Sequence, residues 1–69
     1  MGNVIHRNTT RLKVRKLLDF SNSSNFPEIF EVVKDEYNSW ISTDKNGKTY
    51  SFFIQHLRNE KCFEIIDQS

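Results

Sequence analysis

The triplet Gly47-Lys48-Thr49 is the part of this sequence that most resembles a catalytic motif, because it matches the end of the phosphate-binding P-loop. That motif also has an earlier glycine, at the place where this chain has Ser42, and it continues into a helix. Here a segment rich in β-forming residues follows the triplet. We therefore interpret it as a turn.

Histidine and cysteine, the side chains that bind transition metals, occur only as His6, His56 and Cys62. Their spacing matches no C-x-x-C or H-x-x-x-H pattern, so we expect neither a metal nor a cofactor. His56 is interpreted as an edge residue of a hairpin and Cys62 as a small buried hydrophobe. A single cysteine forms no internal disulfide, which is compatible with a reducing compartment.

The residues of an enzyme active site are not visible in the sequence. No sharp Gly-flanked turn presents a nucleophile next to a base. The carboxylate pairs Glu28 with Glu31 and Asp35 with Glu36 are interpreted as solvated charges. A chain of 69 residues buries only about 60% of its unfolded surface, so a secluded pocket would take up most of its core. We expect a protein that is not an enzyme.

The charges are segregated along the chain, although the net charge is only +1. Residues 1–18 hold no acid and five cations, namely Arg7, Arg11, Lys13, Arg15 and Lys16. All nine acids lie in the remainder, which therefore carries a negative net charge. Either this basic segment folds against the acidic remainder and the charges interleave, or it stays exposed and meets an anionic partner.

Nucleic acid is one such partner. In this interpretation Arg11, Lys13 and Arg15 contact phosphates, and exposed aromatic rings stack on bases. The candidate rings are Tyr50, Phe52 and Phe53. The alternative is that these rings form the core of the domain.

Protein is the other partner class. A small domain with six Phe, two Tyr and one Trp gains stability by burying apolar surface on a larger assembly or on its own copies, as a homo-oligomer. We assign partner binding to the basic segment and two aromatics, namely Arg7, Arg11, Lys13, Arg15, Lys16, Trp40 and Phe53.

The elements that must position these residues are read from periodicity. Strict alternation in residues 10–15 predicts a strand with Leu12 and Val14 on one face and the cations on the other. The alternation breaks at Lys16-Leu17-Leu18, which fits a bulge or a switch into a helical turn, and a helical alternative stays open because Val14, Leu17 and Leu18 also have helical spacing. Small polar residues predict a loop over residues 21–26. Residues 27–40 fit a helix by their apolar spacing and a strand by local alternation, and both stay open; the expected fold includes a helical turn within residues 27–37.

The C-terminal half carries the clearest signal. Residues 40–43 and 48–54 are rich in β-forming residues and flank Asp44-Lys45-Asn46-Gly47, whose Asn-Gly supplies a positive φ. They predict a hairpin. A final strand is predicted over residues 62–66, and residues 67–69 are expected to fray.

Together these elements predict a single domain over residues 1–69 that is mostly β, with four or five short strands. Its parts are the basic segment (1–18), the polar loop (21–26) and a C-terminal β-meander (39–66). Large apolar groups lie on both faces of the strand predicted around Phe52, so we expect a curled sheet such as a small SH3-like barrel.

The opening Asn3-Val4-Ile5-His6-Arg7, with Thr9-Thr10 and later Asn25-Phe26-Pro27, resembles small proteins of tailed bacteriophages. Those proteins begin NVIHRxT and carry D-F-P or D-Y-P further along the chain. This chain has a longer basic stretch before its Phe-Pro and lacks their W-I-x-N-P segment. The resemblance implies an accessory protein of a phage, in the setting of the particle, and it carries over no functional residue.

The first residues lack the apolar run of a signal peptide, and no apolar run approaches the ~18 residues that cross a membrane. We therefore expect a location in a virion or the host cytoplasm rather than secretion, and no membrane partner. The expected function is a non-enzymatic binding module that docks on a larger protein assembly, as an accessory or structural component of a phage particle. The alternative is a small nucleic-acid-binding domain that uses the basic segment.

Overall fold

The computed structural model describes residues 2–69, which form one mostly β domain around a five-stranded antiparallel sheet. The strands are β1 (Arg11–Lys16), β2 (Ile29–Lys34), β3 (Trp40–Thr43), β4 (Thr49–Phe52) and β5 (Phe63–Gln68). A 3-10 turn, η1 (Ser23–Asn25), and a short helix, α1 (Ile54–Arg58), complete the fold. None of the helices in this described part is long and apolar enough to span a membrane.

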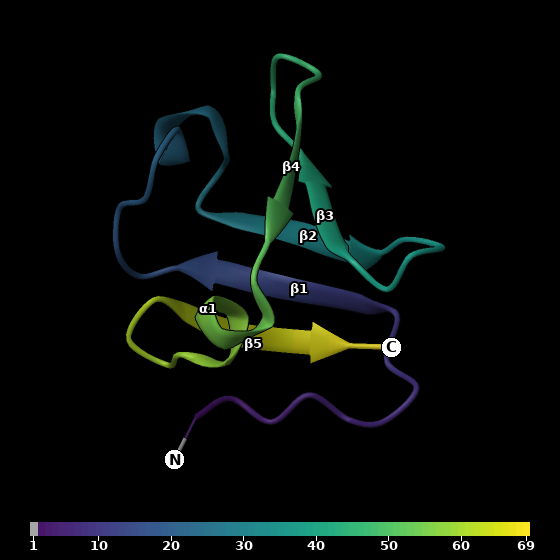
Figure 1. The fold of residues 1–69 in the computed structure, drawn as a ribbon. Coiled ribbons are helices and arrows are strands. Elements are labelled where there is room, and N and C mark those ends of the chain that lie inside the picture. The colour runs from purple at the N-terminus through teal and green to yellow at the C-terminus, as the bar shows by residue number, and fades with distance from the viewer. Residues whose placement is uncertain (1) are drawn as a thin grey trace.

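The strand order is β4-β3-β2-β1-β5, so β4 and β5 are the two edges and do not pair with each other. Figure 1 shows β3 and β4 turning steeply away from β1, β2 and β5. The sheet is therefore open and strongly twisted, and the expected SH3-like barrel is wrong. The twist of the sheet brings β4 over the core, but within residues 2–69 no strand closes the gap between β4 and β5.

The prediction for residues 10–15 is confirmed. Leu12 and Val14 are completely buried, and Arg11 and Lys13 lie on the opposite, exposed face of β1. A single row of apolar side chains on each strand thus builds one buried face of the sheet.

Residues 29–34 form strand β2, which corrects the expected helical turn within residues 27–37. Phe30 and Val32 point into the core, where they pair with Val14 and Leu12 of β1. The apolar residues do recur at helical spacing. Pairing along the buried strand β1 instead requires every second residue to face the core, and this alternation makes the segment a strand. After β2 the chain turns at Asn38, which has a φ of 64°.

The predicted hairpin is confirmed. Asp44 N–H donates to Lys48 C=O at 2.9 Å, and Gly47 takes the positive φ of 83° that the Asn-Gly sequence predicted. Asp44 Oδ1 accepts the N–H groups of Asn46 and Lys48, both at 2.9 Å, which fixes the turn.

The expected strand 48–54 ends earlier, at Phe52, and residues 54–58 form α1. Trp40, the first residue of β3, pairs with Phe52, so residues beyond Phe52 have no partner strand. A helical turn satisfies their backbone and places Leu57 in the core, where it is completely buried. His56 therefore lies on α1 and not on a hairpin edge.

The meander expected over residues 39–66 is also wrong. After α1 the chain crosses to the far edge of the sheet, and β5 pairs with β1, Val14 opposite Ile65 and Leu12 opposite Gln68. The register shifts between Lys13 and Val14, which marks a bulge. Residues 67–69, expected to fray, are paired instead: β5 extends to Gln68, and Ser69 N–H donates to Arg11 C=O at 3.0 Å.

The core lies on one side of the sheet. It is covered by α1, by the loop that contains η1 and by the N-terminal residues, which run beside β5 in Figure 1. Its centre is a cluster of aromatic rings with centroids between 4.8 and 6.5 Å apart, formed by Phe20, Phe26, Phe30, Phe52 and Phe63. The other side of the sheet carries no covering element among the described residues.

Candidate functional site

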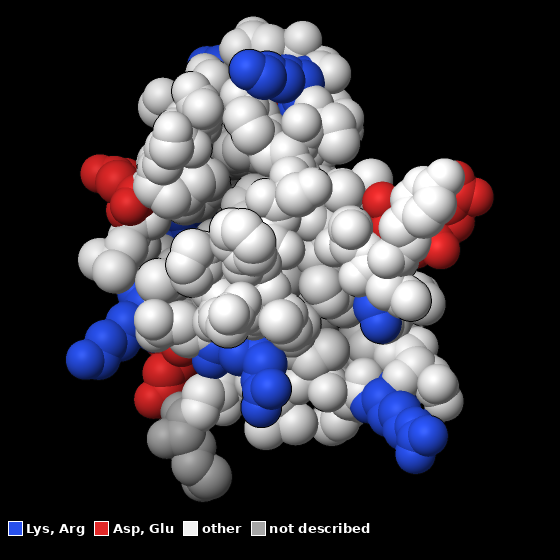
Figure 2. Space-filling model, in the orientation of Figure 1, with Lys and Arg blue, Asp and Glu red and all other residues white. Residues whose placement is uncertain are grey.

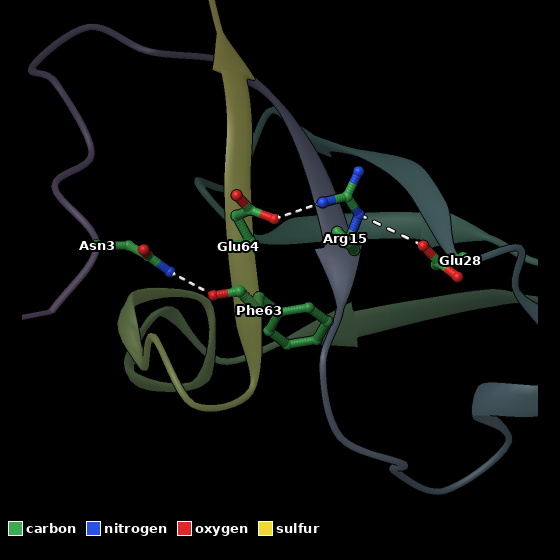
Figure 3. A network of polar contacts seen from close by, with 5 residues as sticks. All are labelled: Asn3, Arg15, Glu28, Phe63 and Glu64. Atoms are coloured by element: carbon green, nitrogen blue, oxygen red, sulfur yellow. Dashed lines mark hydrogen bonds and ion pairs between the residues drawn. The ribbon is translucent and has the colours of Figure 1, made fainter.

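The outward cations of β1 lie among carboxylates of the neighbouring strands. Arg15 Nη1 lies 2.8 Å from Glu64 Oε1, and Arg15 Nε lies 3.4 Å from Glu28 Oε2 (Figure 3). Arg11 Nε lies 3.4 Å from Glu31 Oε2. The charges of this face interleave, as one of the two interpretations of the basic segment predicted.

The two lysines of β1 differ from each other. Lys13 stands opposite Glu31 on β2 and Asp67 on β5 in the sheet register. Lys16 turns inward, and its ammonium donates to the carbonyls of Ser23 and Phe26, both at 2.7 Å. Lys16 therefore holds the loop that contains η1 and does not present a free charge.

Phe53 lies at the rim of an open apolar groove of about 420 Å³. The walls come from the loop after β1 on one side and from β4, the start of α1 and the start of β5 on the other. Its main apolar lining residues are Leu18, Phe20, Phe52, Phe53, Cys62 and Phe63. This groove, called the apolar groove below, is floored by the rings of the aromatic core.

Two large apolar side chains stand at the mouth of this groove without cover. The Phe53 side chain is 70% exposed and Leu18 is 56% exposed. The Phe53 ring makes an edge contact with His56, with centroids 5.7 Å apart. In Figure 2 the face that α1 and β4 turn to the viewer is mostly white, so uncharged side chains dominate it.

The free edge of β4 runs along the same groove. Because Asp44 and Lys48 form a hydrogen-bonded pair, alternation makes Tyr50 the next residue whose main chain bonds to β3. Ser51 therefore directs its N–H and C=O away from β3, and no strand within residues 2–69 pairs with that edge. Ser51 also lines the groove, so an open strand edge and an apolar cavity adjoin each other.

Trp40 and Arg7 lie at a different place. The Trp40 side chain is only 5% exposed and belongs to the core, with Lys34 Nζ 5.4 Å from the centre of its ring. Both Trp40 and Arg7 line a second, more polar hollow of about 490 Å³ with Lys34 and Arg58. Six of the seven predicted partner-binding residues thus divide among three places: Arg11, Lys13 and Arg15 lie on the open face of the sheet, Phe53 at the apolar groove, and Arg7 and Trp40 at this hollow. The seventh, Lys16, lies at none of them, because it turns inward to the loop that contains η1.

Sequence reasoning named Phe53, with Tyr50 and Phe52 as candidate rings for nucleic acid, but missed the other side chains of the groove. Leu18 and Phe20 come from a loop more than thirty residues from Phe53. The one signal that pointed to them was the break in alternation after Lys16, which ends β1. His56 and Cys62 line the groove together, whereas His6 lies at the polar hollow, and no group of three or more possible metal ligands occurs in residues 2–69.

Comparison with known proteins finds no relative: no family model, no curated protein and no solved structure matches this chain. Its function is therefore inferred from its own surfaces.

Proposed function

We propose that this protein is a non-enzymatic docking module that binds an extended segment of another protein at the apolar groove. The single observation that carries this proposal is the Phe53 side chain, which is 70% exposed beside an aromatic-lined cavity and an unpaired strand edge. Large aromatics without cover are typical of binding surfaces, where they act as anchors.

The edge of β4 supports an extended segment as the occupant. A partner strand added to this edge would bond to the main chain of Ser51, while every second side chain would point toward the groove. Main-chain pairing supplies affinity in this mode, and the cavity supplies the preference for an apolar side chain. The resemblance of the opening residues to phage proteins makes an assembly of a phage particle the setting that we propose.

The nucleic-acid alternative receives less support from the geometry. Arg11 and Arg15 are engaged by carboxylates, and Lys16 by two carbonyls. Of the three rings suggested for base stacking, Phe52 belongs to the aromatic core, Tyr50 packs against it, and Phe53 alone is exposed. A strong phosphate interface would first require several of these contacts to break.

The test uses a library of displayed random peptides of about twelve residues, selected for binding to the purified chain. We expect selected peptides to carry apolar residues at alternate positions. On binding, the amides of Thr49, Ser51 and Phe53 should shift in NMR spectra. Phe53→Ser should weaken the binding at least tenfold, about 1.4 kcal/mol or more.

The Phe53→Ser variant is suited to this test because Phe53 is the N-cap residue of α1 and makes no side-chain cap. Serine is a preferred N-cap, so the helix should persist and the stability should change by less than about 1 kcal/mol. The matched control is Tyr37→Ser, which removes another exposed aromatic, from the turn between β2 and β3. Equal losses in both variants, or peptides that shift other amides, would contradict the proposal.

A further inference from the structure

The polar hollow beside α1 gathers positive charge from three separate segments. Arg7 comes from the N-terminal residues, Lys34 from the end of β2 and Arg58 from the end of α1. No aspartate or glutamate lines it. We call this place, bounded by Arg7, Lys34 and Arg58, the cationic hollow.

None of these three cations has a carboxylate partner in the described residues. The ion pairs found in residues 2–69 involve only Arg11 and Arg15. The acid nearest in sequence to Lys34 is Asp35, but its Oδ1 accepts the N–H groups of Tyr37 and Ser39 and so serves its own turn. The acid nearest to Arg58 is Glu60, which forms no ion pair within residues 2–69. Positive charge in the hollow is therefore uncompensated, in contrast to the charge on β1.

The hollow is held in shape by hydrogen bonds that fix the N-terminal residues to the rest of the fold. Gln68 Oε1 accepts His6 N–H at 2.8 Å and lies 3.1 Å from Thr9 Oγ1, while Gln68 Nε2 donates to Val4 C=O at 2.9 Å. The same stretch closes a turn in which Thr9 N–H donates to His6 C=O at 3.1 Å. Arg7 lies within this turn, so its backbone is fixed before any ligand arrives.

The lining of the hollow also includes apolar side chains, from Val4, Ile5, Trp40 and Ile54. Val4 is 66% exposed and Ile54 is 40% exposed. Three cations surrounding exposed aliphatic groups suit a ligand that alternates negative and apolar groups.

We propose that the cationic hollow binds an acidic segment of a partner protein, with aspartate or glutamate carboxylates at the cations and an apolar side chain on Val4 and Ile54. Arg7 and Arg58 can each bind a carboxylate through two parallel hydrogen bonds. Lys34 adds a third positive charge at the rim. This site shares no lining residue with the apolar groove, so the proposal for one site can be refuted while the proposal for the other holds.

A nucleic-acid strand fits the same place less well. Its phosphates would meet the cations, but its bases would need an aromatic face on which to stack. Of the two rings that line the hollow, the Trp40 indole is buried with Lys34 over it, which leaves the small His6 imidazole as the one ring open to a base. A peptide with carboxylates needs no such ring.

The test titrates the isotope-labelled chain with the blocked peptide Glu-Leu-Glu-Leu-Glu at low ionic strength. We expect chemical-shift changes concentrated at the amides of Arg7, Lys34, Ile54 and Arg58. Binding should weaken severalfold when the salt concentration rises from about 20 to about 200 mM, because exposed charges are then screened. The salt series requires no variant and therefore does not depend on how a mutant folds.

Charge-reversal variants locate the site. Arg7→Glu and Arg58→Glu should each weaken binding of the peptide about tenfold or more. Lys45→Glu is the matched control, since it changes the net charge equally at the exposed tip of the β3–β4 hairpin, and it should have less than about a twofold effect.

Four results would overturn the proposal. Equal losses in Lys45→Glu would show an effect of net charge alone, and equal binding of Gln-Leu-Gln-Leu-Gln would show that the charges are not used. Tighter binding of a thymidine oligonucleotide with the same number of charges would assign the hollow to nucleic acid. Inorganic phosphate that reproduces the same shifts at the same concentration would show a general anion site without preference for an acidic segment.

Discussion

Two side-chain amides, Asn3 and Gln68, connect the N-terminal residues to the domain. Asn3 Nδ2 donates to the carbonyls of Leu57 and Phe63 at 3.1 and 2.8 Å, and Figure 3 shows the second of these bonds. The N-terminal backbone also lies close to the end of α1 at Gly2, where an added Cβ would stand 2.5 Å from the carbonyl oxygen of Arg58. Neither amide could be selected from the sequence, because asparagine and glutamine are common at surfaces and the partners are distant backbone groups.

At this scale we predict that Gln68→Ala releases the segment that carries Arg7. It should lower the free energy of unfolding by about 1 kcal/mol and speed amide exchange at His6, because three partly exposed hydrogen bonds are lost. Urea denaturation and hydrogen exchange measure the two effects. Gln55→Ala, on the exposed side of α1 and without a side-chain hydrogen bond in the described structure, should change neither. Unchanged exchange at His6 in Gln68→Ala would refute the role of Gln68.

Elements were predictable where the local pattern clearly favours one structure over its alternative. Alternation around Leu12 and the Asn46-Gly47 turn defined β1 and the hairpin. The type of residues 29–34 stayed open, because β2 forms through pairing with β1, which a local pattern does not contain. Helix α1 was missed because the alternation of Tyr50 and Phe52 continues to His56, whereas the partner strand β3 begins at Trp40 and so ends the pairing at Phe52.

The loop that forms one wall of the apolar groove depends on Lys16. Lys16→Met keeps the length of the side chain but removes the donor of the Phe26 carbonyl and leaves the Ser23 carbonyl with the Phe26 N–H at 3.0 Å. We predict a loss of roughly 1–3 kcal/mol in the free energy of unfolding. Broader NMR signals should appear for residues 18–26, since the loop loses an anchor.

The control for this prediction lies on the same strand. Lys13→Met changes an exposed lysine that has no carboxylate within ion-pair distance in the described residues, and it should cost less than about 0.5 kcal/mol. Similar costs for the two variants in thermal and urea denaturation would show that Lys16 does not hold the loop.

Across the whole molecule, positive charge is compensated on one face and free on another. The open side of the sheet pairs Arg11 and Arg15 with glutamates, whereas the cationic hollow on the covered side contains no acid. The arginines of β1, although far from the acids in sequence, therefore lie next to glutamates in the fold. Uncompensated positive charge gathers instead at Arg7, Lys34 and Arg58. Sequence alone identified Arg7 but not its two neighbours, since they come from separate elements.

This distribution of charge predicts how tightly the chain binds nucleic acid. The variant Glu28→Gln/Glu31→Gln/Glu64→Gln leaves Arg11 and Arg15 without partners and raises the net charge by about three, so it should bind single-stranded DNA at least about tenfold more tightly than the parent at low salt. Fluorescence anisotropy measures this affinity, and its salt dependence should steepen. A parent chain that already binds DNA as tightly as the variant would contradict the view that these carboxylates neutralise β1.

The pairing of β1 with β5 has a consequence for synthesis on the ribosome. The second neighbour of β1 lies about fifty residues later in the chain, so a nascent polypeptide exposes one side of this buried strand until residues 63–68 have left the exit tunnel. Contacts of such long sequence separation form slowly. During that interval Leu12 and Val14 belong to an incomplete sheet whose unpaired edge is prone to aggregation. Early binding of chaperones would protect this edge.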